Sequence, residues 1–267
     1  MGKYFFRSRA SKRAPKCAMC VGSGDINNNQ ILSGRRISDM KLAALYSGGK
    51  DSTYSIYRAK QMGHSVECLI TMHPVADDSA LFHYPNSWVT EYQAQAMQIP
   101  VLGFQVPGKS KDDETKALEE AISQAKTLYN IDGVVFGGIS SVFQKKAFEG
   151  VCEKQGLQAV APIWGIEAEK YYAELLDKKF EVMVVGVSAM GLEREWLGRT
   201  IDRTTLVTLT GLSIKYGFNL TFEGGEAETL VIDCPLFNKK LRVKGANTLW
   251  EGQRGIFEIL EVELLGQ

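Results

Sequence analysis

One short segment near residue 50 has the composition of a phosphate-binding loop. Its residues are Ser47, Gly48, Gly49, Lys50, Asp51 and Ser52. Two adjacent glycines let a backbone turn tightly and bring its N–H groups close to an anion. Lys50 adds a positive charge, and the two serine hydroxyls can donate hydrogen bonds to phosphate oxygens. The segment is therefore predicted to hold the phosphates of ATP.

The acidic residue of this loop excludes the commonest phosphate-binding motif. A Walker A loop has Ser or Thr directly after its lysine, and Asp51 stands there instead. An acid beside bound phosphate is unfavourable unless a cation lies between them. Asp51 is therefore a candidate Mg²⁺ ligand, or it orients Lys50 or the loop. Replacing Lys50 by alanine is expected to abolish ATP turnover and to leave the fold intact.

A second chemically dense segment is the acidic turn Phe222–Thr229. It holds Glu223, Glu226 and Glu228 around the glycine pair Gly224 and Gly225. Such a cluster can bind Mg²⁺, hold ammonium or supply a general base. The spacing alone, however, favours a solvated acidic turn.

The elements that must position these segments alternate between strand and helix. The sequence predicts strands at 42–46, 66–72, 101–106, 133–136 and 158–161, and helices at 50–62, 89–97, 112–129 and 142–155. This alternation predicts a Rossmann-like, doubly wound parallel sheet, whose ligands bind at the carboxyl ends of the strands. Two glycine-rich turns, Gly48–Gly49 and Gly137–Gly138, follow strands and should lie at that edge.

A smaller α+β domain is predicted after residue 164. Its expected helices are 167–177 and 203–216, and its expected strands are 181–187, 229–233, 240–248 and 256–264, the last two forming a hairpin. We therefore divide the chain into a disordered basic leader (1–39), an ATP-binding domain (40–164) and an acceptor domain (165–267). The leader carries eight Lys or Arg against two Asp, although the whole chain has a net charge of zero.

Composition narrows the class of protein. A chain of 267 residues that is 45% hydrophobic and 23% charged is typical of a soluble globular protein. No apolar run is long enough to cross a membrane, and no secretory signal is present, so a cytoplasmic location without membrane association is expected. The body lacks an excess of basic residues, which makes nucleic acid an improbable partner. Five scattered cysteines predict reduced thiols.

Several motifs, in order, resemble a known family. Ser-Gly-Gly-x-Asp-Ser is similar to the PP-loop of the N-type ATP pyrophosphatases. The segment 223–231 together with 233–237 looks like the signature of the diphthine–ammonia ligase family. Four further stretches match that family: 82–94, 137–144, 162–164 and 191–199. The resemblance extends from residue 40 to about residue 262.

The resemblance implies a reaction and its participants. Members of this family use ATP to activate the carboxylate of diphthine, a modified histidine of translation elongation factor two. Ammonia then displaces AMP to give diphthamide, and pyrophosphate is released. The implied partners are therefore the diphthine-bearing factor and ammonium, and a homo-oligomer stays open. Two alternatives also stay open: a PP-loop enzyme that adenylates a tRNA base or a small carboxylate, and a nucleotide-binding regulator without turnover.

The resemblance also implies roles for individual residues. Catalytic roles fall to Lys50, Asp51, Glu226 and Glu228, the last two on the ammonia or acceptor side. Beyond the phosphate loop, nucleotide contacts fall to Met72, His73, Gly137, Ser140, Ser141 and Gln144. Substrate contacts fall to His83, Asn86, Glu223, Gly224 and Gly225. This chain departs from the family pattern at Gly138, Phe143, Ala147, Phe222 and Ala227, and Phe222 stands where the family often has glycine.

Overall fold

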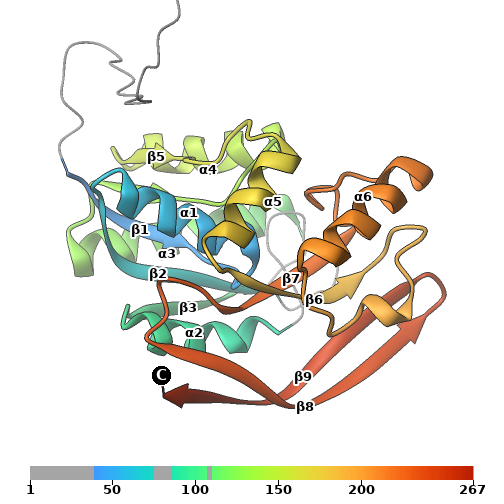
Figure 1. The fold of residues 1–267 in the computed structure, drawn as a ribbon. Coiled ribbons are helices and arrows are strands. Elements are labelled where there is room, and N and C mark those ends of the chain that lie inside the picture. Colours follow the sequence, from blue (N-terminus) through green and yellow to red (C-terminus); the bar gives the residue numbers. More distant parts are fainter. Residues whose placement is uncertain (1–38, 75–85, 107–109, 267) are drawn as a thin grey trace, which may run out of the picture. The chain divides into compact units, whose positions relative to one another are not determined.

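The computed structural model describes residues 39–74, 86–106 and 110–266 (Figure 1). Almost all of the predicted basic leader lies outside these ranges, and so does His83. The predictions made for that leader and for His83 therefore stay predictions.

A five-stranded parallel sheet forms the N-terminal half of the described chain. Its strands are β1 (Lys41–Leu45), β2 (Ser65–Pro74), β3 (Val101–Val106), β4 (Gly133–Val135) and β5 (Gln158–Val160). They lie in the order β3-β2-β1-β4-β5, and every pair is parallel. The chain moves outward from β1 first in one direction and then in the other, so the switch point lies beside β1. The predicted doubly wound sheet is confirmed.

Helices cover both faces of this sheet, and the alternation of side chains along β1 explains how. Leu42 and Ala44 point into one core with Ile56 of α1 (Lys50–Gln61), and α2 (Thr90–Met97) and α5 (Ala168–Asp177) line the same core. Ala43 points into the opposite core with Leu118 of α3 (Lys111–Tyr129), which α4 (Val142–Lys154) completes. Figure 1 shows α1 and α3 on opposite sides of the sheet. Strand side chains alternate in this way because their period is two.

A second sheet is antiparallel. Its strands are β6 (Glu181–Val187), β7 (Ala227–Asp233), β8 (Lys239–Glu251) and β9 (Arg254–Gly266), in the order β7-β6-β9-β8. Strands β8 and β9 form the predicted hairpin but extend further than predicted, with Trp250 opposite Gly255 beside the turn. Helix α6 (Arg203–Tyr216) and two 3-10 turns, η1 (Ser87–Val89) and η2 (Arg194–Trp196), complete the elements.

The two sheets share one hydrophobic core. Leu42 and Ala44 of the parallel sheet belong to the same buried cluster as Val182 and Val231 of the antiparallel sheet. Polar contacts add to this core: the Asn86 amide donates to the carbonyl of Phe257 (2.9 Å) and accepts from the N–H of Ile259 (2.8 Å). The cavity described below is therefore built on a single packed body, and the proposed division at residue 164 stays a prediction.

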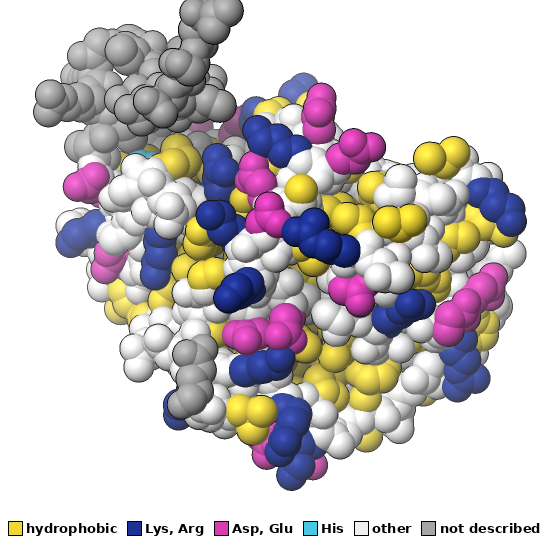
Figure 2. Space-filling model, in the orientation of Figure 1, with side chains coloured by type: hydrophobic (Ala, Val, Ile, Leu, Met, Phe, Trp, Pro, Cys, Tyr) yellow, Lys and Arg dark blue, Asp and Glu magenta, His cyan; other side chains and the backbone are white. Residues whose placement is uncertain are grey.

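The described surface carries charges of both signs. On the face shown in Figure 2, basic and acidic side chains alternate over the described residues and form no broad basic area. Among the described residues, no helix is long and apolar enough to cross a membrane.

Candidate active site

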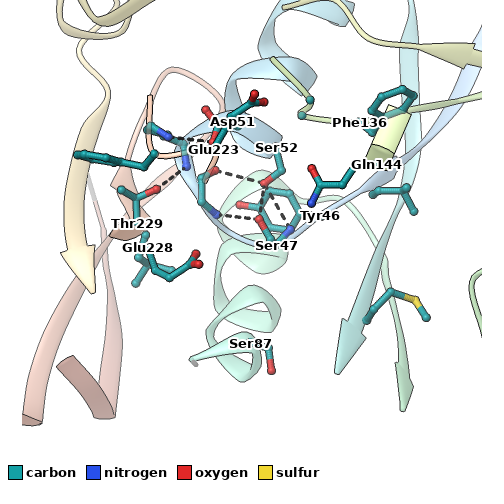
Figure 3. A pocket seen from close by; sticks show the side chains of 18 of the residues that line it. Tyr46, Ser47, Asp51, Ser52, Ser87, Phe136, Gln144, Glu223, Glu228 and Thr229 are labelled. Atoms are coloured by element: carbon teal, nitrogen blue, oxygen red, sulfur yellow. Dashed lines mark hydrogen bonds and ion pairs between the residues drawn. The ribbon is translucent and has the colours of Figure 1, made fainter. Parts of the chain in front are cut away.

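A cavity, whose empty space of about 1190 Å³ includes open solvent, lies at the predicted edge of the parallel sheet. Its walls come from the segments that follow β1, β2 and β4 and, on the other side, from β7 and the turn before it. Figure 3 shows the side chains of both walls around this space. The carboxyl edge of the parallel sheet, where the sequence placed the site, is thus one half of it.

One end of the cavity is apolar. It is lined by Leu45, Ile70, Met72, Phe136 and Phe148. These residues come from the ends of β1 and β2, from the residue after β4 and from α4. An apolar cleft with flat aromatic side chains fits a purine base, with polar groups needed only at its rim.

The phosphate loop lies between this apolar end and the second sheet. Gly48 has a φ of +81°, a left-handed conformation that favours glycine. Gly49 approaches β7 so closely that a Cβ atom would lie 3.1 Å from the carbonyl oxygen of Thr229. The hydroxyls of Ser47 and Ser52 are 3.2 Å apart and both line the cavity. The loop therefore presents two hydroxyl groups and the start of α1 to the cavity.

The two glycine-rich turns meet, as the sequence predicted. A Cβ atom on Gly137 would lie 2.5 Å from the backbone nitrogen of Ser52. Only glycine allows this approach between the turn after β4 and the first turn of α1. Gly137, Gly138 and Gln144 then line the cavity beside the phosphate loop.

Lys50 lies at the base of the cavity and is almost fully buried, with 2% of its side chain exposed. Its ammonium donates to the carbonyl oxygen of Thr221 (2.6 Å) and to the Asp51 carboxylate (2.9 Å). It also lies 5.4 Å from the centre of the Phe222 ring, in cation–π range. Lys50 therefore joins the phosphate loop to the acidic turn, in addition to placing a positive charge below the cavity.

Both oxygens of the Asp51 carboxylate have hydrogen-bond donors. The Tyr171 hydroxyl donates to one oxygen (2.6 Å), and Lys50 donates to the other. Burial, with the charge of Asp51 adding to it, raises the pKa of Tyr171 well above its ordinary value, so this phenol stays a donor. Of the two roles that the sequence left open for Asp51, these contacts favour orienting Lys50 and the loop.

The three glutamates of the acidic turn have three different surroundings. The Glu223 carboxylate accepts from the backbone N–H of Ile139, the N–H of Ser140 (2.5 Å) and the Ser140 hydroxyl. It therefore joins the acidic turn to the segment after β4.

Glu226 folds the turn itself. Its carboxylate accepts from the N–H groups of Asn219 (2.9 Å) and Gly224 (2.8 Å), and it is not among the residues that line the cavity. Glu228 is different, because it lines the cavity from β7, and its carboxylate extends into the space in Figure 3. Of the two glutamates predicted to act on ammonia, only Glu228 therefore faces the space where the reaction would occur.

The other predicted residues fall into two groups. Met72, Gly137, Gln144, Glu223 and Gly225 line the cavity. Five others do not line it, although each is within a few residues of one that does: Ser140, Ser141, His73, Asn86 and Gly224. Ser141 caps α4, and His73 hydrogen bonds through Nδ1 to the hydroxyl of the cavity residue Ser87 (2.9 Å). Burial lowers the pKa of His73, which favours a neutral ring.

Sequence reasoning missed residues that hold the loop from a distance. The Thr229 hydroxyl accepts from the N–H of Lys50 (3.2 Å), and the fully buried Gln93 donates to the carbonyl of Gly48 (2.9 Å). Thr229 is the last residue of the acidic turn, so its place beside the site could have been suspected. Gln93 carries no such signal, because a polar residue within a helix is usually exposed.

The departure from the family pattern at Phe222 has a backbone explanation. Phe222 has a φ of +66°, a conformation that favours glycine, which often occupies this position in the family. Its ring is buried, lines the cavity and covers the Lys50 ammonium. The ring thus occupies space that a glycine would leave open.

Fold and site together define the class of protein. A glycine-rich loop beside the switch point of a doubly wound sheet, with an apolar cleft and hydroxyl groups next to it, is typical of a nucleotide-binding protein of the PP-loop class.

Comparison with known proteins identifies the family. Residues 40–159 match the diphthamide synthase N-terminal domain, and residues 167–265 match the diphthamide synthase C-terminal domain. Human diphthine–ammonia ligase is 32% identical over 228 residues, covering 79% of this chain and 85% of the human protein. The rat enzyme is 33% identical, covering 76% and 83%. The chain belongs to the diphthine–ammonia ligase family, as its motifs predicted.

Two further likenesses have less weight. Diphthine–ammonia ligase of Schizosaccharomyces pombe is 30% identical over 217 residues, which cover 76% of this chain but 36% of that longer protein. The tRNA thiolase NcsA from Methanococcus maripaludis superposes with a TM-score of 0.32 at 13% identity, covering 53% of this chain and 58% of that one. The last likeness is too weak to bear on the fold or the function.

Proposed function

We propose that this protein amidates diphthine on translation elongation factor two with ammonia, converting ATP to AMP and pyrophosphate. One observation supports this most directly. A single cavity is walled on one side by a phosphate loop with an apolar cleft, and on the other by the acidic turn that carries the family signature. A nucleotide and an acceptor can therefore meet in one space.

The first step is the activation of a carboxylate. An oxygen of the diphthine carboxylate attacks the α-phosphorus of ATP, the bond from that phosphorus to the bridging oxygen breaks, and pyrophosphate leaves. The product is an acyl-adenylate. The hydroxyls of Ser47 and Ser52 and the start of α1 are placed to stabilise the departing pyrophosphate. Lys50 contributes its buried charge from below, while it keeps its bond to Thr221.

The second step forms the amide. The nitrogen lone pair of ammonia attacks the carbonyl carbon of the acyl-adenylate, AMP leaves with the electrons of the C–O bond, and the attacking nitrogen releases one proton to solvent to give the neutral amide. Ammonia must first lose the extra proton of ammonium. We assign that proton to the Glu228 carboxylate, which faces the cavity from the acceptor wall.

Magnesium fits this site as a companion of the nucleotide. The described residues hold no cluster of three metal-ligating side chains, and both Asp51 oxygens already accept hydrogen bonds. Mg²⁺ commonly binds through substrate phosphates, water and one or two carboxylates, and it neutralises phosphate charge. Asp51 lines the cavity and would be the carboxylate that contacts the ion in addition to orienting Lys50, whereas Glu228 is assigned the ammonium proton.

Measurement of ATP:pyrophosphate exchange and of AMP release tests this function. Both should require the factor bearing unamidated diphthine, and amide formation should also require ammonium. Formation of ADP, or AMP release with another acceptor but not with this factor, would refute the proposal. Nucleotide binding without any turnover would indicate a regulator instead.

The assignment of Glu228 has its own test. Glu228→Gln should slow amide formation by roughly 10²-fold, the typical contribution of a general base, while pyrophosphate exchange continues because the first step needs no ammonia. Glu251→Gln, on the exposed end of β8, is the matched control and should behave as the wild type. Equal losses of exchange and of amide formation in Glu228→Gln would contradict this assignment.

A further inference from the structure

We propose that Gln93 is a positioning residue of the phosphate loop, which orients the Gly48–Gly49 peptide toward the nucleotide and ties it to the second sheet. This inference rests on the proposed binding of ATP phosphates by the loop. Gln93 lies on α2, outside the cavity lining, and none of its side chain is exposed.

Gln93 and strand β7 both donate hydrogen bonds to the carbonyl group of Gly48. Its side-chain nitrogen donates to the carbonyl oxygen of Gly48 (2.9 Å) and to that of Val231 (2.7 Å). The backbone N–H of Val231 also donates to the Gly48 oxygen (2.9 Å). Two donors, one from α2 and one from β7, therefore fix the direction of the Gly48 carbonyl.

The direction of this carbonyl determines what the next amide can do. A trans peptide is planar, and its C=O and the following N–H point to opposite sides. Because the Gly48 oxygen faces Gln93 and β7, the N–H of Gly49 faces the other way. The Gly49 nitrogen lies 3.4 Å from the Ser47 hydroxyl oxygen, on the side where Ser47 and Gly49 line the cavity. Gln93 thus aims a backbone donor at the phosphate site.

The surroundings of the Gln93 side chain indicate that its N–H donors, and not its oxygen, explain why an amide occupies this position. Its side-chain oxygen is buried and has no hydrogen-bond partner among the described residues. A Cβ atom on Gly48 would lie 2.4 Å from that oxygen, so the amide lies directly against the loop. A buried acceptor without a partner opposes folding. An apolar side chain could fill the same space without that cost, so the two donor bonds account for an amide here.

The same bonds connect the loop to the acceptor wall. Strand β7, which Gln93 holds through Val231, also carries Glu228 and Thr229. The Thr229 hydroxyl in turn accepts from the N–H of Lys50 (3.2 Å). Any shift of β7 would therefore turn the peptide that meets the phosphates.

Binding of ATP and of adenosine to the full chain tests this role. Gln93→Met keeps the size of the side chain but removes both donors. It should weaken ATP binding by roughly tenfold or more, the loss expected when a hydrogen bond to a charged group is misaligned. Adenosine, which has no phosphate, should bind within about twofold of the wild type. Calorimetry of both ligands separates the phosphate site from the base site.

A matched control lies on the same helix. Thr90→Val removes a buried hydroxyl that donates to the carbonyl of Ser87 at the start of the helix, and it should leave ATP binding unchanged. If Gln93→Met does not fold, Gln93→Asn, which draws the amide back by one methylene, has the same expected effect. Unchanged ATP binding, or equal losses for ATP and adenosine, would overturn the positioning role. A wild type that binds no ATP would instead refute the proposed function.

Discussion

Replacing Lys50 by methionine tests the contacts through which the Lys50 ammonium connects the phosphate loop to the start of the acidic turn. Methionine keeps much of the volume of the side chain but removes two contacts of the ammonium. One is the hydrogen bond to the Thr221 carbonyl at 2.6 Å, and the other is the ion pair with Asp51 at 2.9 Å. The motif alone predicts lost turnover with an intact fold, whereas the structure leads us to expect a loss of stability as well.

The expected loss follows from these two contacts. A hydrogen bond to a charged group contributes about 1.5–3 kcal/mol, and breaking a buried ion pair costs about 3–5 kcal/mol. Asp51 is 27% exposed and keeps its bond from Tyr171, which lowers the second figure. The two costs overlap because both arise from one ammonium group. We therefore expect Lys50→Met to lower the free energy of unfolding by about 3 kcal/mol.

Urea unfolding of a double-mutant cycle measures this effect. The partner variant is Asp51→Asn, which keeps an acceptor for Tyr171 but removes the charge. The double variant should be less destabilised than the sum of the singles, by about 1–2 kcal/mol, because no uncompensated charge remains. Lys60→Met, an exposed position on the same helix, is the control and should change stability by less than about 0.5 kcal/mol. A loss as small as this control's in Lys50→Met, or an additive cycle, would refute the reasoning.

Two further predictions concern the fold around the site. Phe222→Ala and Phe222→Gly both remove the buried ring, but only glycine relieves the left-handed backbone, so the glycine variant should be the more stable by about 1 kcal/mol in urea unfolding. The reverse order, which is usual elsewhere because glycine is more flexible, would contradict this. Burial lowers the pKa of His64 below its ordinary 6.5, so the unfolded chain binds the proton first. Stability should then be lost as the pH falls below about 6.5, and His64→Asn, which can still accept from the N–H of Met40, should reduce that loss; an unchanged pH profile would argue against it.

The parallel sheet and the position of the site could be predicted because both follow from local patterns. Apolar runs of four to seven residues alternate with amphipathic helices, and this alternation implies parallel strands with ligands at their carboxyl ends. The glycine pairs at 48–49 and 137–138 follow two of these strands, which placed them at one edge. Predicted strand ends were off mainly in β2, β8 and β9, where pairing with a neighbouring strand extends each strand beyond its apolar core.

The roles of the charged residues could not be predicted, because they depend on which backbone groups come close in the fold. Glu223, Glu226 and Glu228 look equivalent in the sequence. The first accepts from amides 83 and 84 residues away, the second accepts from amides two and seven residues away, and the third faces the cavity. Lys50 likewise finds its carbonyl partner 171 residues away. No spacing rule within one segment contains this information.

These long-range contacts change how the phosphate loop should be understood. In the sequence it is a self-contained hexapeptide that needs only a strand before it and a helix after it. In the fold, its Gly48 carbonyl, Lys50 amide and Lys50 ammonium are all held from β7 or the turn before it, and the core beneath it belongs to both sheets. The acceptor wall is therefore also part of the nucleotide site. The same strand contacts the proposed phosphate loop and carries Glu228, so in the proposed mechanism one strand would position both the loop and the proton acceptor.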